Sequence, residues 1–371
     1  MKTFKITFLV LLVFSLVSNI VYATEGSKNE FEAKELLNEV TEKQAEIVAS
    51  NFALIGSWDY NNIKLVEIFY DTDQTKLGYY FEFYNNDKFV MHVVVSATLN
   101  RDPILQFAAG KLELNKLEGA TAYYVGTSIT YEKNALELKS NLSSESKNTS
   151  SSVLKTLPRN NSINYTSWNY YLNTQTNLAP LAIVEEKELP LTRIWQRTTG
   201  ITNPKTACGP TTGAMIVNYY KSRGYNVRGS TYYGGNAGLV NSLYSKMNTG
   251  IFGTTLPKFA VGLFEHLELD DSITTWTGLS YTHPNSSLHF NTFKTYIDSN
   301  RPSAVRYDYF VDSESYINYH FMAANGYRVD SDGSKYFGFK DPDNGETTTF
   351  TIWRNWTVQA PNFAIHLTHA S

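Results

Sequence analysis

The chain has 371 residues, which suggests two domains, and its formal net charge of −3 argues against binding nucleic acid or another phosphate-rich partner. Only 18% of the residues are charged and 14% are aromatic, so the composition excludes a disordered chain and indicates packed cores. Cys208 is the only cysteine. An internal disulfide is therefore excluded, and the cores alone must stabilise the fold.

The first residues predict a secretory signal. Lys2 and Lys5 precede an apolar run over residues 8–21, and Ala23 follows at a small-residue cleavage position. The alternative is a retained membrane anchor, but the run is shorter than the roughly 20 residues that a spanning helix needs. We expect residues 1–23 to be a signal peptide. The mature protein is then secreted, free or associated with the cell surface, without stable membrane insertion.

Residues 24–135 predict a small α+β domain. A helix is expected over 29–55, because Thr41 and Gln44 have capping-box spacing and an apolar face follows at intervals of three and four. From Ile63 onward, aromatic and β-branched runs predict the strands of an antiparallel meander, with a hairpin turn at 85–87.

The composition then shifts. Residues 141–153 read NLSSESKNTSSSV, which cannot bury enough apolar surface to fold alone. We expect a Ser/Asn-rich linker over 136–165, and such stretches are common sites of proteolytic cleavage.

Residues 166–371 predict a second domain, with helices first and an antiparallel sheet after them. One helix follows Cys208 and is expected to end near Gly224, and two more are expected over 236–248 and 289–300. After Pro302 the pattern becomes β-like. The predicted fold class is therefore α+β, with helices packed on an antiparallel sheet, preceded by the smaller helix-plus-antiparallel-sheet domain.

Cys208 has the surroundings of a nucleophile. It opens the predicted helix, ahead of Gly209 and Pro210, where the helix dipole and free N–H groups favour a thiolate. Gly209 would allow close approach of a ligand. Gly213 is unfavourable inside a helix and suggests tight packing there. The alternative is a buried, inert thiol.

Three further residues complete a candidate site. His320 begins a predicted strand, where a rigid backbone could hold an imidazole base against the helix. Asp341, at the end of the next strand, could orient that ring and fix its tautomer, although Asp343 and Asn344 lie close by. Gln196, upstream of Cys208, could act with the Cys208 N–H as an oxyanion donor.

The C-terminal part contains Gln196, the CGPT motif at Cys208, His320 followed by NGY, and Asp341-Pro342. Through these residues it resembles the C39-like cysteine peptidases, which have a papain-like fold. The resemblance covers roughly 189–371. It implies that Cys208 is the nucleophile, His320 the base, Asp341 the orienting residue and Gln196 the oxyanion donor. It also implies peptide hydrolysis through a thioester. The long interval between Cys208 and His320 suggests insertions near 226–256.

The first domain resembles, more loosely, the propeptide of streptopain-like secreted cysteine peptidases, through TEKQAEIVASNF, FVMHVVVSA and RDPILQF. This resemblance covers roughly 28–115. It implies an N-terminal domain that inhibits or assists the peptidase.

The sequence thus predicts a secreted cysteine peptidase acting on a peptide or protein substrate. No cofactor is implied. A metal site is not expected, because no clustered His/Cys/Asp spacing is present and one cysteine cannot build a thiolate cage. Two alternatives remain open: an acyl-transferring enzyme of transpeptidase or transglutaminase type, and a catalytically inactive secreted binding module.

Overall fold

The computed structural model describes residues 38–125, 128–144, 156–157, 165–173, 183–251, 253–270, 274–284, 286–308 and 319–370. The expected signal peptide lies outside these ranges. Within them, no helix has both the length and the apolar character needed to cross a membrane. The chain from Val40 onward forms one compact unit, which is described below.

The helices are α3 (Glu42–Ile55), α4 (Ala135–Ser144), α5 (Tyr165–Asn173), α6 (Cys208–Ser222), α7 (Asn236–Lys246), α8 (Leu256–Leu267), α9 (Ser287–Asp298) and α10 (Trp356–Gln359), with short 3-10 turns at Pro204–Thr206, Ser230–Tyr233 and Ala360–Asn362. The strands are β1 (Asn62–Tyr70), β2 (Lys76–Asn85), β3 (Lys88–Ser96), β4 (Ile104–Ala108), β5 (Thr121–Val125), β6 (Ser128–Glu132), β7 (Ile183–Glu188), β8 (Trp276–Thr282), β9 (Ser303–Asp308), β10 (Tyr319–Asp330), β11 (Lys335–Lys340), β12 (Ile352–Asn355) and β13 (Phe363–Ala370).

The predicted local signals in the N-terminal part are confirmed. Thr41 caps α3 in a capping box: its side chain accepts from the Gln44 N–H, and the Gln44 side chain accepts from the Thr41 N–H. Between β2 and β3, Asn86 and Asp87 both have positive φ, as a tight hairpin requires. The helix expected over 29–55 begins later, at Glu42, because residues 38–41 are not helical and Thr41 caps the helix in an extended conformation; residues 29–37 lie outside the described ranges.

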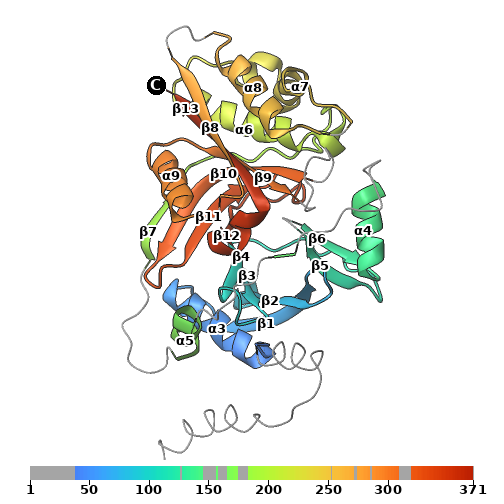
Figure 1. Cartoon of the computed structure of the whole chain (residues 1–371), viewed down its shortest axis with the longest axis vertical. Coiled ribbons are helices and arrows are strands. Elements are labelled where there is room, and N and C mark those ends of the chain that lie inside the picture. The colour runs from blue at the N-terminus through green and yellow to red at the C-terminus, as the bar shows by residue number, and fades with distance from the viewer. Residues whose placement is uncertain are drawn as a thin grey trace, which may run out of the picture. The chain divides into compact units, whose positions relative to one another are not determined.

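The described strands form one sheet in the order β6-β5-β1-β2-β3-β4-β12-β11-β10-β9-β13-β8, with β7 pairing to β10. All pairs are antiparallel except a short parallel contact between β1 and β5. The N-terminal strands and the C-terminal strands meet where β4 pairs with β12 (Figure 1). The predicted class, helices with an antiparallel sheet, is confirmed.

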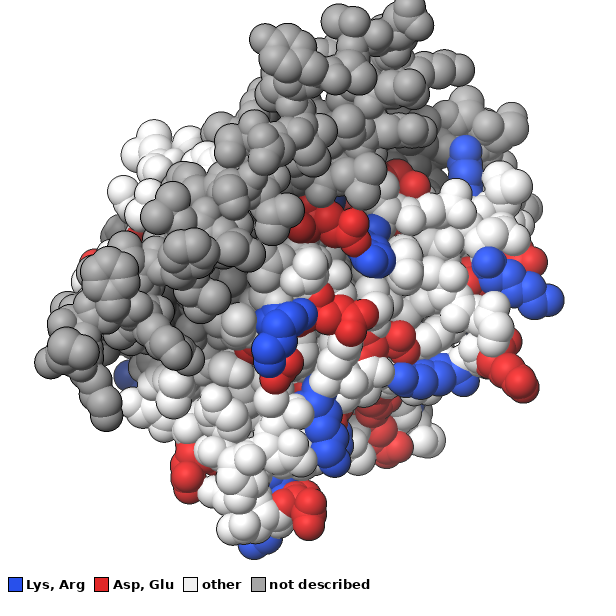
Figure 2. Space-filling model, turned by 90° about the horizontal axis from the view of Figure 1, so that it is seen from below, with Lys and Arg blue, Asp and Glu red and all other residues white. Residues whose placement is uncertain are grey.

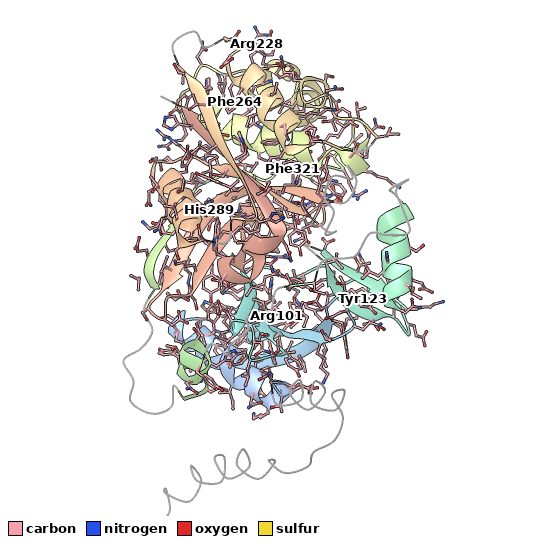
Figure 3. The ribbon with its side chains drawn as sticks, in the orientation of Figure 1. Arg101, Tyr123, Arg228, Phe264, His289 and Phe321 are labelled. Carbon is pink, nitrogen blue, oxygen red and sulfur yellow. The ribbon has the colours of Figure 1, made fainter. Side chains whose placement is uncertain are left out.

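Helix α6 is the central helix of the C-terminal part. It is buried over most of its length, and α7 and α8 pack against it at Gly213, where an added Cβ would lie 2.7 Å from Met247 Cε. This close packing confirms the prediction made from Gly213. On the sheet side, Phe321 of β10 stacks on Phe259 of α8 with ring centroids 4.9 Å apart, and Figure 3 labels Phe321 between helices and sheet.

Part of the stretch expected to be a linker is helical: α4 occupies Ala135–Ser144. Helix formation there follows from Asn134, whose side chain accepts from the first N–H groups of the helix. Residues 145–155 and 158–164 lie outside the described ranges. The domain boundaries at 135 and 166 stay predictions.

The charged side chains are mixed by sign. Figure 2 shows Lys and Arg interspersed with Asp and Glu over the described part of one face, rather than gathered into a patch of one sign. Such a face lacks the basic field that attracts a phosphate backbone.

Candidate active site

Cys208 is the first residue of α6, as predicted. A 3-10 turn over Pro204–Thr206 leads into it, and the first helical hydrogen bond runs from Thr211 N to Ala207 O over 2.8 Å. The opening N–H groups of a helix have no acceptor within it, so that of Cys208 can serve a ligand. The Cys208 side chain is buried, with 6% of its surface exposed.

His320 and Asp341 come from neighbouring strands. His320 is the second residue of β10, and Asp341 directly follows β11, which pairs antiparallel with β10. The His320 ring nitrogen Nε2 lies 2.7 Å from Asp341 Oδ1. The imidazole also hydrogen-bonds the Cys208 side chain. Both His320 and Asp341 are buried. The structure thus brings together Cys208, His320 and Asp341 in one hydrogen-bonded series.

The pKa of His320 is set by opposing influences. Burial alone would lower it, but the Asp341 carboxylate and the hydrogen bond to Cys208 raise it, and the net pKa lies well above the ordinary histidine value. An imidazolium is therefore favoured at neutral pH. A cation beside Cys208 stabilises a sulfur anion in turn.

Gln196 is hydrogen-bonded to the turn that precedes α6. Its Nε2 donates to the carbonyl of Pro204 over 3.0 Å, and its backbone N–H donates to the carbonyl of Pro342 over 2.8 Å. The side chain is buried. Nε2 carries a second hydrogen, which leaves one donor for a reacting group. Asp341 also orders its own loop, since its Oδ1 accepts from the Asp343 N–H over 2.8 Å.

Two arginines that were not predicted as site residues hold the loop between β11 and β12, which begins at Asp341. Arg193 Nε donates to the carbonyl of Asp341, and its Nη1 donates to the carbonyl of Thr348 over 2.8 Å. Arg197 forms a bidentate pair with Asp343, at 2.6 and 2.7 Å. One short segment therefore carries Gln196 and also holds the loop of Asp341. Only the proximity of these arginines to Gln196 in the sequence hinted at this.

Gly209 was expected to allow close approach of a ligand, but the atoms that lie against it belong to the protein itself. A Cβ at Gly209 would lie 2.8 Å from Thr254 Oγ1 and 3.5 Å from Phe321 Cδ2. Thr254 in turn shares a hydrogen bond with Thr249 over 2.6 Å. Thr249 and Thr254 therefore pack against the first turn of α6.

The C-terminal part is similar in sequence to a known family. Residues 188–360 match the Peptidase_C39 like family. The C39-like region so defined contains Gln196, Cys208, His320 and Asp341, and it confirms the resemblance predicted from the CGPT motif. In the described ranges, no group of three His, Cys, Asp or Glu side chains is arranged to hold a metal ion.

Several solved structures, including the following two, are similar to the chain. A fragment of prointerpain A from Prevotella intermedia, in mutant form, is 13% identical, with a TM-score of 0.43, and the match covers 82% of this chain and 98% of that one. A recombinant stem bromelain precursor is 15% identical, with a TM-score of 0.22, over 48% of this chain and 70% of that one. No curated protein matches the chain in sequence.

Proposed function

We propose that this protein is a secreted cysteine peptidase in which Cys208 is the nucleophile, His320 the acid–base residue and Asp341 the orienting residue. The observation that carries the proposal is the buried hydrogen-bonded series from the Cys208 side chain through His320 to Asp341, at the N-terminus of α6. The match of residues 188–360 to a peptidase family supports the same conclusion.

Acylation begins with the proton on His320 and the negative charge on sulfur. The Cys208 thiolate attacks the carbonyl carbon of a peptide bond, and a C–S bond forms as the carbonyl oxygen takes up the negative charge. The Cys208 N–H and the free hydrogen on Gln196 Nε2 are the donors for that oxyanion. His320 then donates its proton to the leaving nitrogen, the C–N bond breaks, and the amine departs from a thioester.

Deacylation reverses these roles. Neutral His320 accepts a proton from water, whose oxygen attacks the thioester carbonyl, and the oxyanion returns to the same donors. The C–S bond then breaks, which releases the carboxylic acid and restores the ion pair of Cys208 and His320. Asp341 keeps His320 in one orientation throughout, because the bond at Nε2 leaves the opposite nitrogen for sulfur and substrate.

The substrate class is a peptide or protein. Residues 24–135 are proposed as an N-terminal domain that is propeptide-like in fold, and residues 1–23 as a signal peptide removed after Ala23. An N-terminal sequence read of protein from the culture medium tests the export proposal. A mature chain that starts at Thr24 is expected, whereas protein retained in the cell with Met1 intact would contradict it.

The catalytic proposal is tested with a thiol alkylator at pH 6 and a generic peptide substrate. Wild type should label at Cys208 much faster than a free thiol and should cleave the substrate. His320→Ala should lose the fast labelling, and Cys208→Ala should lose cleavage by about 10⁴-fold or more. Slow labelling in wild type would indicate an inactive binding module. Product that retains an added amine would indicate an acyltransferase.

A further inference from the structure

The N-terminal and C-terminal strands share one continuous sheet. At the junction, Phe107 of β4 pairs with Trp353 of β12, and Gln106 pairs with Arg354. Without the N-terminal strands, β12 would be an edge strand with its outer N–H and C=O groups unpaired, because its other neighbour is β11.

The core under α3 is completed by side chains from beyond the expected linker. Trp168, Tyr171, Tyr336 and Trp353 are all buried in the same cluster as the apolar face of α3 and strands β2–β4. Phe107 stacks on Trp353 with ring centroids 6.0 Å apart and meets Tyr336 edge-on at 5.3 Å. A core built from both sides of a linker is not separated when the linker is cut.

A second core is shared in the same way. Val358 of α10 is 3% exposed and lies in one cluster with side chains of β1–β5 that include Phe69 and Leu77. Leu157, from inside the expected linker, belongs to the same cluster. Its backbone N–H donates to Asp71 over 3.1 Å, and its carbonyl accepts from Arg101 over 2.8 Å, while Arg101 and Asp71 form a buried ion pair at 2.6 Å. Figure 3 labels Arg101 within the N-terminal part.

Buried polar contacts also cross the junction. Arg354, 2% exposed, donates to Gln106 Oε1 over 3.0 Å, and its guanidinium lies 4.7 Å from the centre of the Tyr124 ring. The side chain of Asn355 donates to Asp102 over 3.0 Å. Separating the two parts would deprive these buried polar groups of their partners, which is costly.

The N-terminal part reaches the candidate site as well. In the segment after β4, Gly110 lies against the Phe350 ring and the Glu113 carboxylate lies against Gly345, both on the loop that follows Asp341. Glu113 also acts electrostatically on Arg193, which holds that loop.

From these contacts we infer that residues 40–132 are a permanent structural subunit of the folded protein and not a propeptide that departs after cleavage. The surface that binds this subunit is the outer edge of β12 together with Trp353 and Val358, and its partner is the N-terminal part of the same chain. A cut between the two parts yields a nicked, two-fragment protein that stays assembled. The inference concerns assembly and does not depend on the proposed peptidase activity.

The test uses the full chain with Cys208→Ala, which removes self-cleavage. A recognition sequence for a specific protease is inserted after Thr149, and in a second version after Asn177, so that each cut is made after folding. Size-exclusion chromatography is then run without denaturant at about 1 µM protein. In both versions we expect the two fragments to co-elute at the volume of the uncut chain and to separate only in denaturant. Elution of a free N-terminal fragment from either version would overturn the inference.

The binding surface is tested with matched valines. Val358→Lys places a charge in the shared core, so the uncut variant should elute as one chain and the nicked variant should release its N-terminal fragment. Val261→Lys is the control, because Val261 is 56% exposed on α8 and should leave the nicked protein assembled. If Val358→Lys does not fold, Trp353→Ala replaces it. Co-elution of a folded, nicked variant of this kind would show that the surface is wrongly assigned.

Discussion

The Arg193 side chain hydrogen-bonds the backbone of Asp341: the guanidinium Nε donates to the Asp341 carbonyl. The same side chain donates to the carbonyl of Thr348. The aspartate that hydrogen-bonds His320 is therefore positioned by a group that does not touch the imidazole. Arg193 is a positioning residue for the proposed chemistry. Its hydrogen bonds connect the segment that carries Gln196 to the loop that begins at Asp341.

Arg193→Met should loosen the loop of Asp341. We expect the rate of Cys208 alkylation at pH 6 to fall about tenfold, because a carboxylate that is less well positioned stabilises the His320 imidazolium less. The control is Arg197→Met, which removes the ion pair with Asp343. Arg197 is 44% exposed in that pair, so its loss should change the rate by about twofold or less. Equal effects of the two variants would contradict the assignment.

Asp341→Asn should move the alkaline limb of the alkylation profile. In wild type the pKa of His320 is raised above the ordinary value, so the imidazolium persists at neutral pH and is lost as pH rises through that raised pKa. Removing the carboxylate lowers the pKa of His320 and shifts this loss to lower pH.

Asp343→Asn serves as the control for that variant, because Asp343 pairs with Arg197 and not with His320. Its profile should follow that of wild type. If Asp343→Asn shifts the limb and Asp341→Asn does not, Asp343 is the orienting residue.

Gln196→Ala should separate catalysis from thiol reactivity. Loss of one oxyanion donor is expected to lower kcat for peptide hydrolysis by about 10²–10³-fold. Alkylation of Cys208 passes through no tetrahedral oxyanion, so its rate should stay within about twofold of wild type. Parallel losses in both measurements would indicate that Gln196 supports the turn at Pro204 instead.

His92 should make the fold sensitive to acid. Burial lowers the pKa of His92 to about 4, and the ring hydrogen-bonds Gly110 O and Gln106 in the neutral form. The unfolded chain therefore binds the extra proton first as pH falls from about 6.5, and stability drops by up to about 3 kcal/mol by the time pH reaches about 4.

Thermal unfolding measured from pH 7 to pH 4 checks this expectation. His92→Gln should be less stable at pH 7 but should show a flatter dependence on pH in that window. His283→Gln, at an exposed histidine, should keep the slope of wild type. An unchanged slope in His92→Gln would place the acid sensitivity elsewhere, and His366, whose burial also lowers its pKa to about 4, would be the next residue to change.

Local signals predicted the elements that carry the candidate site. The start of α6 at Cys208 followed from CGP, and the strand positions of His320 and Asp341 followed from runs of aromatic and β-branched residues. The predicted end near Gly224 was close, since α6 ends at Ser222 and Gly224 has positive φ. Each of these signals depends only on residues near one another in the chain.

Other elements were missed because their signals are weak or distant. Helix α8 lies beside the region interpreted as insertions, although Thr255 caps it and Pro257 opens it. Strands β7 and β8 are largely exposed and therefore lack the alternation that marks a half-buried strand. The junction between β4 and β12 could not be predicted, since no local pattern specifies which strand edges meet.

The junction between β4 and β12 also bears on how the chain folds. Gln106 and Arg354, which hydrogen-bond across it, are separated by 248 positions in the sequence. Contacts of such high sequence separation close long loops and slow the search for the native state. During synthesis from the N-terminus, the edge of β4 that pairs with β12 has no strand beside it until nearly the whole polypeptide has emerged. Pairing of β4 with β12 is therefore expected to be a late step in folding. A ribosome-bound chain that stops before β12 should bind chaperones through the exposed edge of β4.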